Sequence, residues 1–300
     1  MTGRPLPVPA ATVVLLRDGP EGVEVFMQRR HGRSGFMAGA TVFPGGKVDG
    51  ADGGLDALGL SPQDCGRALA MDDPAQAAAF FVAAIRELHE EARVLLFADA
   101  AGCLVQGATA AALTEAMDGL RQGHRVDAAA HHRLLLDAGL RPDLSQLAPF
   151  ARWVTPRIEP RRFDTVFFAA LVPSDQRAGL DGYEITHALW CRPETALAEH
   201  AAGGAIVLPP PTLHTLERLR QLPGPAEATL RALAQTGVGR RIEPHFIADS
   251  DDGPLIALPD DPLHPDYAAD TGSGGRGAAQ RNRFVLRDGR FTRRSTPGAL

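Results

Sequence analysis

Three glutamates are crowded into the segment 83–96, which has the residue pattern of a helix. Glu87 precedes Glu90 and Glu91 by three and four residues, so all three carboxylates share one helical face. Apolar residues recur at the spacing of a buried helical stripe that would anchor these acids, and they are Phe81, Ile85, Leu88 and Ala92. Like charges at this spacing repel unless a cation compensates them, and carboxylate oxygens suit Mg²⁺ or Mn²⁺. The segment therefore has the composition of a site for a hard divalent cation.

A solvated acidic face, partly neutralised by Arg86, is the competing explanation, and for an isolated helix it is the more common one. The upstream segment 40–49 changes the balance, because a short β-prone run there meets Pro44-Gly45-Gly46. Such a corner can bring bare backbone against a ligand. Together the two segments favour a ligand site.

These two pieces resemble the Nudix box, in which a glycine-containing loop is followed by a helix that reads Arg-Glu-apolar-x-Glu-Glu. Here residues 86–91 read Arg-Glu-Leu-His-Glu-Glu. The resemblance implies a divalent metal cofactor, Mg²⁺ or Mn²⁺, with a glycine carbonyl assisting three carboxylates. By motif position the implied metal ligands are Glu87, Glu90, Glu91 and Gly45. Arg86 would hold Glu90 or the glycine loop in place rather than react.

The segment departs from the usual Nudix signature in the length of its loop and at two residue positions. The family places its glycine 14 residues before the arginine, whereas Gly46 and Arg86 are 40 apart, so about 26 extra residues interrupt the motif. The glutamate expected eight residues before the arginine falls on Ala78. The glycine expected after Glu-Glu-x is Arg93, where a left-handed backbone costs a non-glycine residue about 1 kcal/mol. These departures affect the expected loop shape and pKa tuning, but none of them removes a primary metal ligand.

Long insertions within this motif are common in the Nudix branch that resembles the mammalian peroxisomal coenzyme A diphosphatase. Stretches at 36–46, 153–168 and 208–212 also look like that branch, and the resemblance covers about residues 8–225. It implies hydrolysis of the diphosphate in coenzyme A or acyl-coenzyme A. ADP-sugars and dinucleotides stay open as substrates, and so does a non-catalytic module that senses a nucleotide.

Further residues are candidates to accept the proton of the attacking water or to bind the phosphates of the substrate. A base must reach the attacking water, and it could be one of the helix glutamates or Glu184, which lies in Asp-Gly-Tyr-Glu before a strand. An exposed turn acid explains Glu184 equally well. Arg30 and Lys47 are candidates to meet substrate phosphate, although a solvated basic side chain is the default for each.

The fold class expected is α/β, namely a Nudix-type α/β/α sandwich with a mixed sheet, inserted helical segments and a small C-terminal β extension. The Nudix domain is assigned to residues 1–239, with insertions at about 50–73 and 108–148, and the extension to 240–300. Expected strands lie at 11–17, 23–30, 41–43, 152–155, 164–171 and 189–191, and expected helices at 74–91, 109–122, 127–138, 194–201, 212–221 and 225–235. In the extension we expect strands at 243–247 and 255–258, a hairpin at 283–292 that turns at Asp288-Gly289, and a glycine-rich linker at 271–277.

Composition limits the remaining function classes. With 300 residues and 44% hydrophobic content the chain can bury a large core, and a net charge of −5 gives no field that recruits nucleic acid. Three scattered cysteines, no 18-residue apolar run and no signal-peptide core favour a cytoplasmic protein without a membrane partner. His131-His132 falls in an amphipathic helix, where we expect a surface pair rather than a metal site. The expected partner is a small nucleoside diphosphate derivative.

Overall fold

The computed structural model describes residues 5–30, 39–122, 126–179, 185–222, 224–267 and 281–295. A seven-stranded mixed sheet lies at its centre, with strand order β3-β2-β1-β8-β7, while β4 pairs with β1 and β9 with β2. Only β1 and β8 are parallel; the other pairs in this sheet are antiparallel. The strands are β1 (Val8–Gly19), β2 (Gly22–Arg30), β3 (Thr41–Val42), β4 (Gly45–Lys47), β7 (Ala148–Val154), β8 (Phe163–Leu171) and β9 (Ile185–Cys191). The expected mixed sheet is confirmed.

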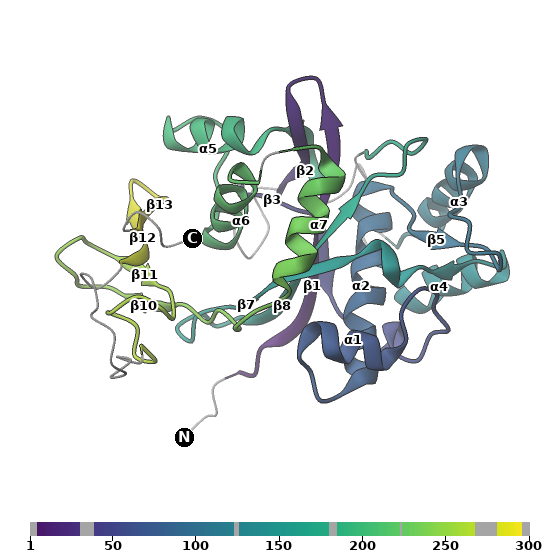
Figure 1. Cartoon of the computed structure of the whole chain (residues 1–300), viewed down its shortest axis with the longest axis horizontal. Coiled ribbons are helices and arrows are strands. Elements are labelled where there is room, and N and C mark those ends of the chain that lie inside the picture. Colours follow the sequence, from purple (N-terminus) through teal and green to yellow (C-terminus); the bar gives the residue numbers. More distant parts are fainter. Residues whose placement is uncertain are drawn as a thin grey trace.

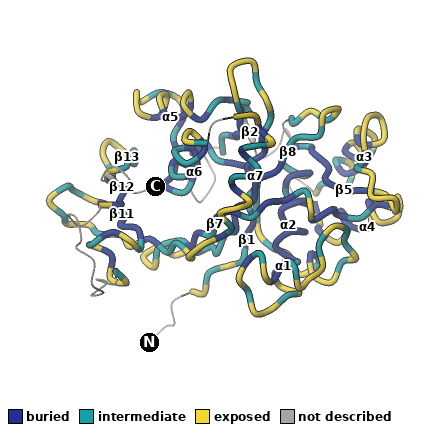
Figure 2. The backbone as a smooth tube through the Cα atoms, in the orientation of Figure 1, coloured by how far each residue is buried: buried dark blue, intermediate teal, exposed yellow. Residues whose placement is uncertain are grey.

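Strand β1 divides the interior into two apolar layers because successive side chains of a strand point to opposite faces. Val13 and Leu15 join one core cluster with the helix α2 (Pro74–Ala92). Val14 and Leu16 join the other, with α5 (Pro193–Ala201), α6 (Pro210–Arg220) and α7 (Ala226–Thr236). Figure 2 shows buried backbone along the sheet strands and α2, with exposed residues gathered on the loops. The result is the α/β/α sandwich that the sequence predicts.

Helix α2 begins and ends at the residues that the sequence predicts. The Asp73 side chain accepts from the amides of Ala75 and Gln76 at 3.0 and 3.1 Å, and Pro74 occupies the first helical turn. At the other end Arg93 has φ 61°, the left-handed conformation expected for a helix C-terminus that glycine usually supplies. Both ends fix the register that puts the three glutamates on one face.

The inserted segments pack beside α2 at one end of the molecule (Figure 1). The first contains a short 3₁₀ turn, η1 (Gly50–Asp52), and α1 (Pro62–Leu69), which Ser61 caps by accepting from the Asp64 amide. The second contains α3 (Gly107–Gly119), α4 (Ala128–Asp137), β6 (Arg141–Pro142) and the 3₁₀ turn η2 (Leu144–Gln146). Strand β5 (Phe97–Ala98) lies before this insertion in the sequence and pairs with β6. No single described helix is long and apolar enough to cross a membrane. Among the described helices, only α1 and α2 taken together have the length and hydropathy of a span, and they are bent by 87° relative to each other.

A second sheet lies at the other end of the long axis in Figure 1. Its antiparallel strands run in the order β10 (His245–Ile247), β11 (Leu255–Ala257), β12 (Asn282–Arg287) and β13 (Arg290–Ser295). Asp288 and Gly289 turn the last hairpin with φ 49° and 74°, as the Asp-Gly pair predicts. The expected linker at 271–277 lies outside the described residues.

Candidate active site

The three glutamates of α2 line a cavity of about 820 Å³ together with Gly45, Gly46, Arg30 and Lys47. Strand β4 supplies the glycines and Lys47, and β2 ends at Arg30. A Cβ built on Gly46 would lie 2.4 Å from the Glu87 carboxylate, so any other residue here would displace that carboxylate. The glycine corner and the acidic helix therefore meet, as the sequence predicts.

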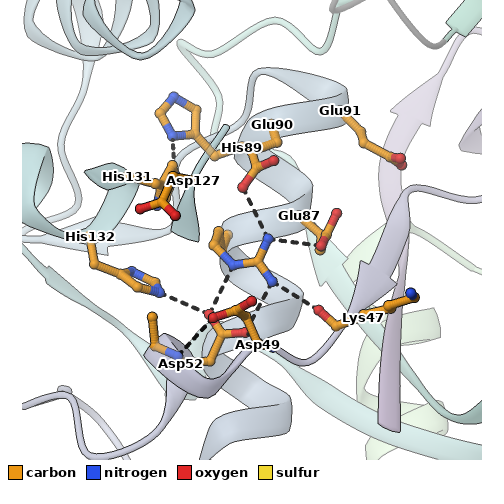
Figure 3. Close-up of polar contacts among 12 residues, drawn as sticks. Lys47, Asp49, Asp52, Glu87, His89, Glu90, Glu91, Asp127, His131 and His132 are labelled. Atoms are coloured by element: carbon orange, nitrogen blue, oxygen red, sulfur yellow. Dashed lines mark hydrogen bonds and ion pairs between the residues drawn. The ribbon is translucent and has the colours of Figure 1, made fainter. Parts of the chain in front are cut away.

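Arg86 is the hub of the site. Its Nη1 donates to Glu87 Oε1 at 2.8 Å and to Glu90 Oε1 at 3.0 Å, and its Nη2 donates to the Lys47 carbonyl at 2.9 Å. Figure 3 marks these contacts with dashed lines. Burial lowers the pKa of Arg86, but the charges of Glu87 and Asp52 outweigh that effect and raise it, so the guanidinium stays charged. Arg86 thus positions two of the expected metal ligands and the glycine loop.

Asp52 is the functional residue that the sequence analysis missed. Its carboxylate accepts from Arg86 Nε at 2.8 Å, from Arg86 Nη2 at 3.0 Å and from His132 Nε2 at 2.8 Å. Burial raises its pKa, but the hydrogen bonds from His132 and Arg86 outweigh this and lower it. The motif acid was expected at Ala78 on a count back from Arg86, and that count runs through the insertion. Counted forward from Gly46, the same motif position, six residues on, is Asp52, so most of the insertion follows this acid.

Glu91 is held separately from the other two acids. The Gly45 amide donates to Glu91 Oε2 at 2.9 Å, and Gln28 Nε2 donates to the same oxygen. Figure 3 shows Glu91 pointing away from Glu90. Burial raises the pKa of Glu91 to about 8, and the charge of Glu87 adds to the effect. Nothing in the local pattern singles out Gln28, which lies between Met27 and Arg29 near the end of β2.

Glu90 is also hard to ionise in this surrounding. Burial raises its pKa to about 7, the charge of Glu87 adds to the effect, and Arg86 opposes it. Arg121 Nη2 donates to the backbone carbonyl of Glu90 at 2.8 Å and so ties the second insertion to the end of α2. Burial therefore favours the protonated forms of Glu90 and Glu91 near neutral pH.

Comparison with known proteins agrees with this geometry. Residues 66–219 match the family model described as NUDT19 Nudix domain. The chain belongs to this Nudix family. The human protein named acyl-coenzyme A diphosphatase NUDT19 is 29% identical over 279 residues, which cover 81% of this chain and 73% of the human one. The chicken protein of the same name is 30% identical over 295 residues, covering 85% and 76%.

A solved structure supports the fold independently. The crystal structure of a NUDIX hydrolase from Alicyclobacillus acidocaldarius aligns with a TM-score of 0.57 and 28% identity, covering 72% of this chain and 91% of that one. The chain is accordingly a Nudix hydrolase. Nudix hydrolases generally use divalent metal ions.

The carboxylates of this Nudix hydrolase are suitable ligands for a divalent ion, although in this structure they do not converge on a single metal position. No group of three or more His, Cys, Asp or Glu side chains within the described part of the chain is arranged to hold a metal. Hydrogen bonds explain why the carboxylates point in different directions. Arg86 binds Glu87 and Glu90, whereas Gly45 and Gln28 donate to Glu91. Raised carboxylate pKa values mark a cluster that a cation would stabilise. The Gly45 contact seen is through its amide, so the carbonyl ligand stays a prediction.

The histidine pair of α4 is buried, and the expectation of a surface pair is wrong. His131 is 0% exposed and His132 is 3% exposed. His131 Nε2 lies 2.9 Å from His89 Nδ1, and His89 Nε2 lies 3.1 Å from Thr114 Oγ1. Because Thr114 donates to the Ala110 carbonyl, its hydroxyl accepts from His89. These contacts tie α3 and α4 to the acidic helix, and the amphipathic pattern of α4 alone cannot reveal such a partner.

The remaining predicted site residues are two cations, Arg30 and Lys47, and one acid, Glu184. Arg30 and Lys47 do lie on the cavity wall with the acids, as a phosphate contact requires. Glu184 lies outside the described residues, so its role as a base stays a prediction.

Proposed function

We propose that this Nudix hydrolase cleaves the diphosphate of coenzyme A or acyl-coenzyme A with a divalent metal ion. The products would be adenosine 3′,5′-bisphosphate and phosphopantetheine or its acyl form. The observation that carries the proposal is the set of three carboxylates of α2, which line a large cavity beside the Gly46 backbone and two cationic side chains. The names of the human and chicken relatives, which match over 81% and 85% of the chain, support the substrate class.

Glu87, Glu90 and Glu91 would hold Mg²⁺ or Mn²⁺. Such an ion neutralises a diphosphate and acidifies the water that attacks phosphorus. The chain itself supplies orientation, since Arg86 holds Glu87 and Glu90 and is in turn fixed by the buried Asp52. The cationic side chains of Arg30 and Lys47 face the same cavity and would bind the phosphate oxygens.

The proton of the attacking water needs an acceptor within hydrogen-bond reach. A helix glutamate that the ion leaves uncoordinated could serve, because a base works best when its pKa is close to the working pH, and in the metal-free site burial raises the pKa of Glu90 to about 7 and that of Glu91 to about 8. These two residues are therefore suited to the role. Glu184 is the further candidate from the sequence.

The test is a hydrolysis assay with Mg²⁺ or Mn²⁺ on coenzyme A, an acyl-coenzyme A, an ADP-sugar and a dinucleotide. We expect cleavage of the coenzyme A compounds, and Glu90→Gln should lower turnover by about 10²–10⁴-fold, the range for a lost acid or base. Glu227→Gln is the control, because Glu227 is an exposed helical acid that pairs with Arg231 and does not line the cavity. It should keep wild-type turnover.

Two results would redirect the proposal. Cleavage of the ADP-sugar or dinucleotide with no action on coenzyme A compounds would overturn the substrate class and keep the hydrolase. Binding of a nucleotide with no turnover for any compound would favour the sensing module, in which the acids are vestigial.

A further inference from the structure

One of the contacts that hold Asp52 comes from the second insertion. His132 Nε2, on α4, lies 2.8 Å from Asp52 Oδ1, although the two residues are 80 apart in the sequence. The two side chains are 4% and 0% exposed, so water does not compete for the contact. Figure 3 shows the chain of side chains that runs from His132 through Asp52 to Arg86. Arg86 in turn donates to Glu87 and Glu90, so consecutive hydrogen bonds link α4 to the acids.

Asp52 orients the guanidinium of Arg86 because each carboxylate oxygen binds both the guanidinium and an anchor. Oδ1 accepts from Arg86 Nε at 2.8 Å and from His132. Oδ2 accepts from Arg86 Nη2 at 3.0 Å and from the Asp49 amide at 2.7 Å. A two-point contact of this kind fixes the plane of a guanidinium. Without His132 the carboxylate would keep only the Asp49 anchor, and the Nη1 edge that binds the two glutamates would lose its fixed direction.

Packing alone does not account for a histidine at position 132. Because a carboxylate only accepts, Nε2 carries a proton. Nδ1 is buried and has no hydrogen-bond partner among the described residues. A buried nitrogen without a partner costs free energy, and an apolar side chain of similar size would fill the space without that cost. The hydrogen bond to Asp52 is therefore the contact that explains the histidine.

The second insertion reaches the acids at two other points. Arg121 Nη2 donates to the Glu90 carbonyl at 2.8 Å. Asp127 and Ala128, at the start of α4, line the same cavity as Glu90. The insertion thus forms part of the cavity wall, and through His132 it also supplies part of the buried support behind the acids.

We propose that His132 is a positioning residue for the metal-binding glutamates, so that the second insertion is part of the catalytic unit. The inference rests on the proposed metal-dependent hydrolysis, because Glu87 and Glu90 are its expected metal ligands. His132 does not line the cavity and acts through Asp52 and Arg86. Groups that orient metal ligands contribute about 10–100-fold to metal affinity or activity. Because two residues intervene, we expect about tenfold, the lower end of that range.

The test measures the Mn²⁺ dissociation constant of the full chain by calorimetry without substrate, and kcat and KM for coenzyme A at saturating Mn²⁺. His132→Leu should weaken Mn²⁺ binding about tenfold and change KM by less than about twofold, since the side chain does not line the cavity. His132→Gln should restore most of the affinity, because its amide nitrogen reaches nearly as far as the histidine Nε2. His132→Asn carries the same amide on a side chain one methylene shorter and should not restore it.

His264→Leu is the matched control for the loss of a buried histidine. His264 is 6% exposed, and its Nε2 lies 2.8 Å from the Glu243 carbonyl. Neither of these two residues lines the cavity. The variant should lose stability in urea unfolding and keep the wild-type Mn²⁺ dissociation constant. Partial unfolding lowers the number of binding sites rather than their affinity, so the comparison separates positioning from folding.

The outcomes separate this inference from the function on which it rests. Equal Mn²⁺ affinity in the wild type, His132→Leu and His132→Asn would overturn the positioning role and leave the hydrolase intact. Equal weakening in His132→Gln and His132→Asn would also overturn it, because the donor would then not matter. A wild type that neither binds Mn²⁺ nor cleaves coenzyme A would overturn the proposed function itself. If a variant fails to fold, nitrogen NMR of the wild type decides: a proton on Nε2 of His132 supports the contact, and a ring protonated only on Nδ1 refutes it.

Discussion

Removal of the Asp52 carboxylate should destabilise the protein much more than removal of an exposed carboxylate that makes a similar contact. The Asp52 side chain is 0% exposed, and it receives two hydrogen bonds from Arg86, one from His132 and one from the Asp49 amide. Breaking a buried ion pair costs about 3–5 kcal/mol. Because Glu87 and Glu90 still compensate the guanidinium, we expect Asp52→Ala to fall near the lower value.

A loss of about 3 kcal/mol corresponds to roughly 6–12 °C in Tm, at about 2–4 °C per kcal/mol for chains of this size class. Urea unfolding and thermal denaturation at pH 7 measure it. Asp56→Ala is the matched control, since Asp56 also pairs with an arginine, Arg141, but its side chain is 74% exposed. That variant should lose no more than about 1 kcal/mol.

The pH dependence of the difference adds a second check. The pKa of Asp52 in the folded protein lies below the ordinary value of 3.8, so the ionised form carries the stabilisation. The contribution is complete above about pH 4 and is lost as the pH falls through the lowered pKa. If Asp52→Ala costs no more than Asp56→Ala at pH 7, the reasoning about the Arg86 hub is refuted.

Two further predictions concern the metal and a helix end. Mn²⁺ affinity should rise as the pH increases from 6 to 9 and then level off, because Glu90 and Glu91, with pKa values near 7 and 8, must lose protons to bind. Calorimetry in buffers of different ionisation enthalpy measures both affinity and released protons, and a flat profile with no proton release contradicts this. Ala70→Gly should stabilise the protein by up to about 1 kcal/mol, since the exposed Ala70 ends α1 with φ 49°. Urea unfolding tests this prediction, and a destabilised variant would contradict it.

The acidic helix was predictable because all of its signals are local. Asp73-Pro74 marks the start, the apolar stripe sets the buried face, and the expected left-handed residue at Arg93 marks the end. The hairpin at Asp288-Gly289 is local in the same sense. Each depends on residues within a few positions, which is the range over which propensity and capping act.

The partners of the helix were not predictable because they come from distant parts of the chain. Asp52 is 34 residues from Arg86, and His131 is 42 residues from His89. In the sequence these polar side chains look like surface residues. They are buried only because the inserted segments pack against α2. The C-terminal sheet is a further case: its strands were expected, but the parallel bridge between Trp153 of β7 and Ile242, just before that sheet, depends on tertiary structure.

The interrupted Nudix box remains intact in space because the insertion lies between two residues that still meet. The usual spacing of eight residues between the acid and the arginine becomes 34 between Asp52 and Arg86, about two doublings of the loop. Each doubling adds about 0.6 kcal/mol of closure entropy, or roughly 1.2 kcal/mol in all. Leu69 of the insertion is 1% exposed in the core beside α2, and burial of one such side chain contributes about 1.5–3 kcal/mol. Burial of Leu69 opposes this closure cost, and the Asp52–Arg86 pair that orients the glutamates is preserved.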